Sequence, residues 1–87
     1  MKFSQEEIEV MKEVFGKGKK WIARCSFNQV WASEKKPFKD YFVNAWITND
    51  YTDIELNNKL FSFIKWEDEK PFYIGDLFEI NFNGEIE

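Results

Sequence analysis

The chain has 87 residues with a formal net charge of −4, and ten Phe, four Trp and three Tyr supply large side chains for a core. This length fits one domain, residues 1–87, and leaves no room for a second core. There is no histidine, which removes the commonest general base and the commonest metal ligand. We find no catalytic, cofactor-binding or metal-binding pattern, and we expect a protein that is not an enzyme and uses no cofactor.

A signal peptide has an apolar segment behind a basic start. The first residues of this sequence do not show that pattern. No apolar run approaches the roughly 18 residues of a membrane span. The single cysteine, Cys25, cannot form an internal disulfide. These features predict a cytoplasmic protein that makes no membrane contact.

Residues 4–15 carry the clearest helical pattern. Ser4 and Glu7 have the spacing of a capping box, in which each side chain bonds the backbone amide of the other residue. Gly16 is a candidate for the C-terminal cap, and Gly18 is a second candidate. The apolar residues fall on one stripe at helical spacing: Ile8, Met11, Val14 and Phe15.

The pattern after the helix changes to that of strands, and the region 19–82 is predicted to be rich in β-structure. Residues 20–25 and 29–33 are predicted to form a hairpin through a turn at 26–28. In its first strand, Trp21, Ala23 and Cys25 share one face. Ile22 and Arg24 share the other.

Further along the chain, residues 41–47 are rich in β-branched and aromatic side chains and predict the strongest strand. Residues 51–56 alternate as a fourth strand. Residues 60–66 are expected to begin as a turn and end as a strand, and residues 67–71 to form a charged loop. The segment 75–82 fits a short helix or a strand, and both readings stay open.

Together these elements predict an α+β fold. Its N-terminal helix packs on a curved antiparallel sheet of four or five strands. Because the predicted hairpins follow one another, we expect a meander that curls into a partly open, SH3-like barrel or a roll. An uncovered edge strand such as 51–56 also offers a route to a homodimer.

Charge divides the chain into unlike halves. Residues 1–40 hold nine basic and six acidic residues, whereas residues 41–87 hold three basic and ten acidic residues. Either the two halves pair across the folded surface, or the second half presents an acidic face to a basic protein partner. On the second interpretation, the candidate protein-contact residues are Trp66, Glu67, Asp68 and Glu69.

A different binding hypothesis starts from the basic first half. Small β-barrels bind single-stranded nucleic acid with cationic side chains and exposed aromatic rings. The candidate contacts are Lys17, Lys19, Lys20, Arg24 and Trp31. A sequence pI near 4.9 weighs against a dedicated nucleic-acid-binding protein. We therefore keep this reading as the alternative to protein binding.

Three segments, taken together, resemble small uncharacterised proteins encoded by phages and prophages of low-GC Gram-positive bacteria. They are the Lys-Lys-Trp-Ile-Ala-Arg stretch at 19–24, residues 33–38, and the stretch at 63–71 that contains Trp-Glu-Asp-Glu. The resemblance implies a phage accessory protein, made in the host cytoplasm, that acts on a host or phage protein. It implies no role for any single residue.

Overall fold

The computed structural model describes residues 3–49 and 52–80, with the side chains of 78–80 left out. The fold is α+β, with an N-terminal helix and a four-stranded antiparallel sheet, as the sequence predicts. The elements are α1 (Gln5–Gly16), β1 (Trp21–Arg24), β2 (Val30–Ser33), β3 (Phe38–Asp40), β4 (Ala45–Ile47), β5 (Ile54–Leu56), β6 (Phe72–Tyr73) and α2 (Gly75–Ile80).

Helix α1 begins at the predicted capping box. The Ser4 hydroxyl accepts the Glu7 amide at 3.1 Å, and the Glu7 carboxylate accepts the Ser4 amide at 2.9 Å. These bonds satisfy two amides that the first turn of a helix otherwise leaves without partners. At the other end, Gly18 takes the left-handed conformation with φ 88°, so the second of the two candidate glycines reverses the chain.

The first hairpin is confirmed, with each strand slightly shorter than predicted. Residues of β1 pair with β2 in antiparallel register, from Trp21 opposite Ser33 to Arg24 opposite Val30. The turn between them closes through a bond from the Asn28 amide to the Cys25 carbonyl, and Asn28 adopts φ 72°. Asparagine tolerates this left-handed conformation better than most residues.

The expected meander is wrong, because the strand order of the larger sheet is β5-β2-β1-β6. The chain leaves this sheet after β2, forms a separate hairpin from β3 and β4, and returns as β5 at the outer edge of β2. In the described part of the chain the sheet stays open, with β5 and β6 at its edges. A closed barrel is not formed there, and the SH3-like detail stays a prediction.

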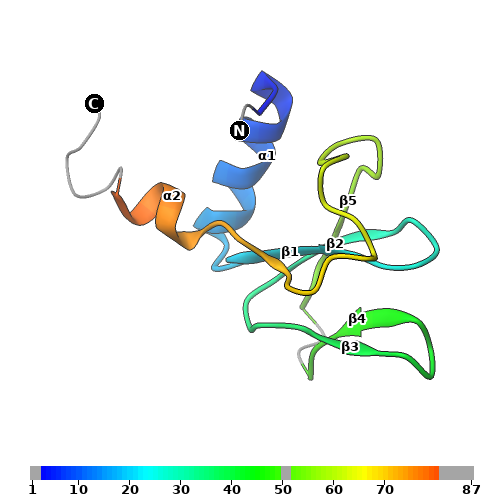
Figure 1. Cartoon of the computed structure of the whole chain (residues 1–87). Coiled ribbons are helices and arrows are strands. Elements are labelled where there is room, and N and C mark those ends of the chain that lie inside the picture. The colour runs from blue at the N-terminus through cyan, green and yellow to red at the C-terminus, as the bar shows by residue number, and fades with distance from the viewer. Residues whose placement is uncertain (1–2, 50–51, 81–87) are drawn as a thin grey trace.

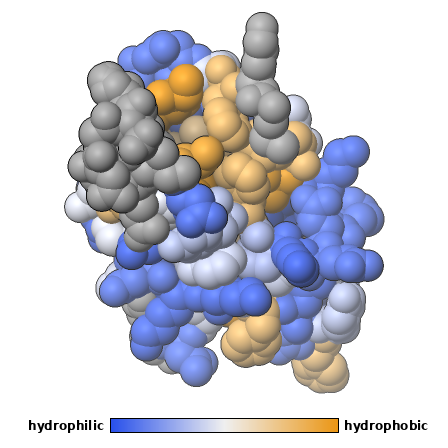
Figure 2. Space-filling model, turned by 60° about the vertical axis from the view of Figure 1, so that its left-hand side comes forward, coloured by the Kyte–Doolittle hydropathy of each residue, from blue (hydrophilic) through white to orange (hydrophobic). Residues whose placement is uncertain are grey.

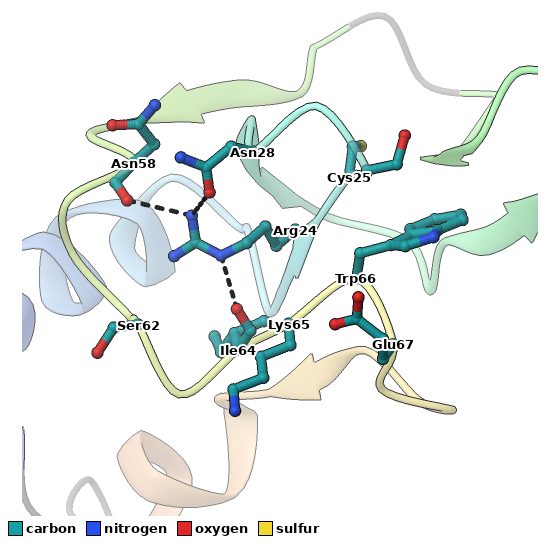
Figure 3. Close-up of a pocket in the computed structure, with 10 residues that line it drawn as sticks. Arg24, Cys25, Asn28, Asn58, Ser62, Ile64, Lys65, Trp66 and Glu67 are labelled. Atoms are coloured by element: carbon teal, nitrogen blue, oxygen red, sulfur yellow. Dashed lines mark hydrogen bonds between the residues drawn. The ribbon is translucent and has the colours of Figure 1, made fainter.

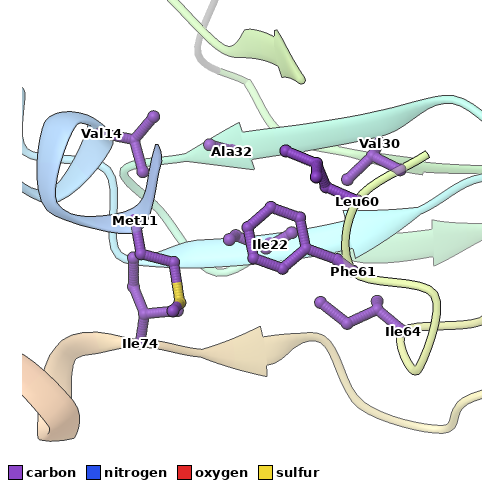
Figure 4. Close-up of a cluster of buried hydrophobic side chains, with 9 residues drawn as sticks. All are labelled: Met11, Val14, Ile22, Val30, Ala32, Leu60, Phe61, Ile64 and Ile74. Atoms are coloured by element: carbon purple, nitrogen blue, oxygen red, sulfur yellow. The ribbon is translucent and has the colours of Figure 1, made fainter. Parts of the chain in front are cut away.

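The central sheet lies between two layers (Figure 1). Helix α1 covers one face, and the β3–β4 hairpin lies on the other side. The main core fills the helix side, where Ile22 and Phe61 are fully buried (Figure 4). Nine buried residues form it: Met11, Val14, Ile22, Val30, Ala32, Leu60, Phe61, Ile64 and Ile74.

The hairpin side holds a smaller cluster. Its buried members are Ala23, Cys25 and Trp46, and the half-buried rings of Trp31 and Trp66 pack against them. The alternation predicted for β1 is thereby confirmed, since Ala23 and Cys25 lie in this cluster and Ile22 lies in the main core.

The strand predicted over 41–47 is confirmed only for residues 45–47 and is wrong for residues 41–44. Residues 38–40 and 45–47 are two short strands, and residues 41–44 form the turn between them. The Asp40 side chain accepts the Phe42 amide at 2.9 Å, and Asn44 adopts φ 55°. Such Asp and Asn positions stabilise a turn, and here they outweigh the β-propensity of the residues between them.

The predicted strand ending at 66 is also absent, because residues 60–66 form turns and irregular backbone. Strand β6 at 72–73 was not predicted. Residues 67–71 form the expected loop, and 75–80 take the helical alternative. Tyr51 of the predicted fourth strand and residues 81–82 of the tail lie outside the described residues.

Candidate functional site

The two hairpin turns are joined to each other at one end of the molecule. The Ser26 hydroxyl donates to the Asn44 carbonyl at 2.8 Å, and the Ser26 amide approaches the same oxygen at 3.3 Å. Both turns project to the right in Figure 1, away from α2. The two turns therefore present their side chains as one surface.

That surface is apolar. Phe27 is 75% exposed in the first turn, and Tyr41, Phe42 and Val43 are 71%, 95% and 51% exposed in the second. We name these four residues the hairpin-end surface. A large apolar residue exposed alone is ordinary, but a group of them on joined turns is typical of a contact surface.

A lysine held among aromatic rings lies directly behind the second turn. Lys39 Nζ is 4.6 Å from the ring centroid of Trp66, 5.3 Å from that of Trp46 and 5.8 Å from that of Tyr41. The rings of Tyr41 and Trp66 also meet edge to face, with 5.9 Å between centroids. An ammonium is attracted to the face of each ring, so this cluster links the β3–β4 hairpin to the loop that begins at Trp66.

The predicted acidic contact residues separate into different roles. Trp66 is half-buried in the lysine cluster, and Glu67 is exposed beside it. Asp68 caps its own turn, since its carboxylate accepts the Lys65 amide at 3.0 Å. Glu69 is exposed and lines a different pocket from the one lined by Glu67. Trp66 and Glu67 line the pocket that also contains Ser26 and Asn28 of the first hairpin turn, whereas Glu69 lines a pocket with Tyr41 of the second turn.

Arg24 is a structural residue in this fold. Its side chain is 8% exposed, and all of its side-chain N–H groups donate hydrogen bonds, of which Figure 3 draws those to Asn28, Asn58 and Ile64. The guanidinium donates to the Ile64 carbonyl and to the Asn28 side chain, both at 2.6 Å. It also donates to the carbonyls of Asn58, Leu60 and Phe61 at 3.1, 2.9 and 2.9 Å. Four of the five donated bonds therefore hold the irregular segment 58–64, whose carbonyls have no strand partner, and the fifth joins Arg24 to the first hairpin turn.

A pocket of about 370 Å³ opens beside Arg24 (Figure 3). It lies between the first hairpin turn, which contributes Ser26 and Asn28, and the segment that carries Trp66 and Glu67. The N–H donors of Arg24 are all bonded to the protein itself. A ligand in this pocket would therefore contact neutral polar groups together with the side chains of Trp66, Lys65 and Glu67. The pocket therefore places groups that can form hydrogen bonds next to the apolar hairpin-end surface.

The predicted nucleic-acid contacts are not gathered on one exposed face. Lys19 is buried and donates to the Thr52 hydroxyl at 2.6 Å, and Arg24 is used as described. Lys17 forms a 3.5 Å ion pair with Glu13 on the exposed side of α1. The two remaining candidates are half-buried: Lys20 lies 6.0 Å over the ring of Phe15, and Trp31 packs in the cluster of Cys25 and Trp46.

Cys25 is a buried thiol, as its place on an apolar strand face predicts. The Trp46 amide donates to its sulfur at 3.4 Å. Burial raises the pKa of the Cys25 thiol above its ordinary value, and the bond with the Trp46 backbone opposes this in part. Since the thiolate is the reactive form, this environment disfavours nucleophilic chemistry.

The opposite side of the molecule has a different character. Seen with α2 forward, apolar residues gather in the upper middle of the surface, hydrophilic residues lie at its top left, and the lower part is mostly hydrophilic (Figure 2).

The described residues hold neither a metal-binding cluster nor a membrane-spanning helix. Residues 3–49 and 52–80 contain no group of three metal-ligating side chains that could hold an ion. No helix among them combines the length and the apolar character that crossing a membrane requires.

Comparisons with protein-family models, with curated proteins and with solved structures found no match. The site is therefore interpreted from its own geometry. Tyr41, Phe42 and Val43 were missed by sequence reasoning, because they lie in the segment predicted as a strand. The signal that identifies their turn is the pair of turn-forming residues, Asp40 and Asn44, on either side of them.

Proposed function

We propose that this chain is a non-enzymatic protein-binding module that contacts its partner through the hairpin-end surface. The observation that carries the proposal is the exposure of Phe27, Tyr41, Phe42 and Val43 on two turns joined through Ser26 and Asn44. Aromatic side chains dominate the energetics of protein interfaces. Because the two turns are joined, the surface loses less conformational entropy when it binds a partner.

The neighbouring residues indicate the chemistry of the partner. Trp66 adds a half-buried ring beside the apolar turns, and exposed Glu67 adds a negative charge at the edge. A partner with an apolar patch flanked by basic side chains complements this arrangement, because charge at an interface edge steers association. Of the four predicted protein-contact residues, we therefore keep Trp66 and Glu67 in the proposed contact surface.

Two observations support a role without catalysis. The sequence has no histidine, and the thiol of Cys25 is buried with a raised pKa. Nucleophilic catalysis by serine or cysteine generally requires a neighbouring base or a lowered pKa. Binding therefore explains the exposed residues more simply than chemistry does.

The resemblance to small phage and prophage proteins supplies the biological setting of the proposal. On that reading the chain is an accessory protein in the cytoplasm of a bacterial host, and its partner is a host or phage protein. A small binding module without catalytic groups fits such a role, since occupying a partner's surface is enough to alter the partner's activity.

The test is affinity capture from a lysate of a low-GC Gram-positive bacterium with three forms of the protein. The test variant carries Phe27→Ser and Phe42→Ser. Its control carries Leu77→Ser, which also removes an exposed apolar side chain (37% exposed) but on α2. We expect the unaltered protein and the control to enrich the same partner, and the double variant to lose it. Equal recovery by all three forms would contradict the proposal.

Self-association through β5 is a second candidate, favoured by the position of this strand at the sheet edge. An edge strand offers unpaired backbone groups to another chain. Sedimentation across a concentration series tests it: a constant molecular mass would exclude a homodimer at the concentrations used. Replacing Glu55, the exposed central residue of β5, by proline would remove a dimer that forms this way.

A further inference from the structure

A second pocket, of about 260 Å³, lies beside the β3 strand and differs in character from the one at Arg24. Three lysines and one glutamate line it, together with three aromatic rings. The complete lining is Lys36, Pro37, Phe38, Lys39, Tyr41, Trp46, Glu69, Lys70 and Pro71. In a chain with a net charge of −4, this concentration of positive charge and aromatic surface is a local exception.

Two of the lysines are already positioned by aromatic rings. Lys39 Nζ sits among Tyr41, Trp46 and Trp66, as described above. Lys36 Nζ lies 5.8 Å over the ring of Trp21. Lysine side chains lose much rotamer freedom when they bind a ligand. Ammonium groups that are already held in place lose less of it.

The remaining lining restricts what the pocket can recognise. Pro37 and Pro71 have no backbone N–H, so the lysine ammoniums are prominent hydrogen-bond donors in this lining. Phe38 is 52% exposed and Tyr41 is 71% exposed, which leaves ring surface open to a planar ligand. The pocket thus offers cations for an anion and rings for stacking.

We propose that this pocket binds one nucleotide unit, with its phosphate on Lys36, Lys39 and Lys70 and its base against the exposed rings. The volume of about 260 Å³ is slightly below the range of about 300–1,000 Å³ that is usual for small-ligand sites, so the pocket has room for no more than one unit. The unit belongs either to a free nucleotide or to a single strand of nucleic acid. This site contains none of the candidate contacts Lys17, Lys19, Lys20, Arg24 and Trp31, and it does not depend on the protein-binding proposal.

An acidic peptide would also be attracted to the lysines, but it leaves the rings without a planar partner. Stacking of a base on an aromatic side chain contributes about 1–3 kcal/mol, close to tenfold or more in affinity. Pairing of rings and cations is how proteins bind single strands without reading their sequence. The combination therefore favours a nucleotide over a peptide.

The test is fluorescence anisotropy with a labelled ten-residue oligothymidylate. Three unlabelled competitors complete it: ATP, an abasic chain with the same number of phosphates, and decaglutamate. We expect the oligothymidylate to bind about tenfold more tightly than the abasic chain. Effective competition by ATP identifies a free nucleotide as the source, and competition only by the oligonucleotide identifies a single strand. Equal competition by the abasic chain or decaglutamate, or no binding at low salt, would overturn the proposal.

Matched variants locate the site. Lys36→Gln with Lys70→Gln removes two pocket lysines, and Lys12→Gln with Lys59→Gln removes two exposed lysines elsewhere. Each phosphate contact on a single strand contributes about −0.7 to the slope of log affinity against log salt. The pocket variant is expected to lose about tenfold in affinity and about 1.4 of this slope, and the control to change affinity by less than about twofold. An equal loss in both would show that general charge, and not this pocket, attracts the ligand.

Discussion

The two faces of the central sheet differ in how many side chains they bury. The helix side buries nine residues around Ile22 and Phe61, whereas the hairpin side buries only Ala23, Cys25 and Trp46. The turns next to the thinner side carry the most exposed apolar residues of the described chain, led by Phe42. We infer that the helix side supplies most of the stability and that the hairpin side supplies the binding surfaces.

The polar contacts that hold each side together also differ in strength. Arg24, whose side chain is buried, fixes the irregular segment on the helix side with four hydrogen bonds and the first hairpin turn with a fifth, and hydrogen bonds are stronger when they are buried. The hairpin side relies on Lys39 among the rings of Tyr41, Trp46 and Trp66 and on a thiol that accepts one amide, and both kinds of contact are weaker. This comparison leads to the following predictions.

The largest effect is expected for Arg24→Lys. The ammonium keeps the charge but cannot reproduce the five-donor fork, so several buried carbonyls lose their partners. Breaking a buried charged network costs about 3–5 kcal/mol, a large part of the total stability of a small domain. Urea unfolding measures it, with Asn28→Gly as the control that removes a single partner, keeps the left-handed turn conformation accessible and costs about 1 kcal/mol. A loss below about 1 kcal/mol for Arg24→Lys would contradict the role given to Arg24.

A smaller and pH-dependent effect is expected for Glu7→Gln. The hydrogen bond from the Ser4 backbone lowers the pKa of Glu7, burial raises it in part, and the bond from the Phe61 amide lowers it again. The carboxylate is therefore favoured in the folded protein. Its contribution is present above the ordinary pKa of a glutamate and is lost as the pH falls through the lowered folded value.

Unfolding in urea at about pH 7 and about pH 3 checks this. The variant should be less stable than the unaltered protein by about 1 kcal/mol near neutral pH, because glutamine replaces one of the two acceptors by a donor. The difference should shrink in acid. Glu6→Gln, at an exposed position of the same turn, is the matched control. A difference that does not change with pH would argue against the carboxylate as the cause.

Lys39→Met should cost about 0.5–1 kcal/mol. Methionine keeps the length and apolar stem but removes the cation from the rings of Tyr41, Trp46 and Trp66. The measurement is the free energy of unfolding together with the tryptophan emission spectrum. Lys35→Met, at an exposed position outside the cluster, should change neither. A stability loss as large as that of Arg24→Lys would show that the hairpin side is more important for stability than we infer.

The smallest effect on stability is expected for Phe27→Ser combined with Phe42→Ser. Both rings are mostly exposed, so their removal should shift the free energy of unfolding by less than about 0.5 kcal/mol. Circular dichroism and urea unfolding check this. A large loss would mean that these rings pack within the fold, and the loss of partner capture would then no longer identify a contact surface.

The sequence predicts the helix side well and the hairpin side poorly, for a physical reason. The capping box at Ser4 and Glu7 and the hairpin around residues 26–28 depend on neighbours in sequence, and both are confirmed. Their signals are local and need no knowledge of the rest of the fold. The position of Gly18 at the helix end belongs to the same class.

The features that failed depend on distant parts of the chain. Arg24 looked like a surface cation because its carbonyl partners lie 34–40 residues away in sequence. The strand predicted over 41–47 failed because Phe42 and Val43 have high β-propensity, while the turn depends on Asp40 and Asn44. Of the candidate contacts, Trp66 and Glu67 line the pocket beside the first hairpin turn, whereas Phe42 was predicted only as part of a strand.

Native-state hydrogen exchange tests the division between the two sides most directly. Amides of β1 and β2, and the Ile64 amide bonded to the Phe61 carbonyl, should exchange only through global unfolding. Amides of β3 and β4 should exchange through a local opening of clearly lower free energy. Equal protection of both hairpins, at the free energy of global unfolding, would contradict the claim that stability resides on the helix side of the sheet.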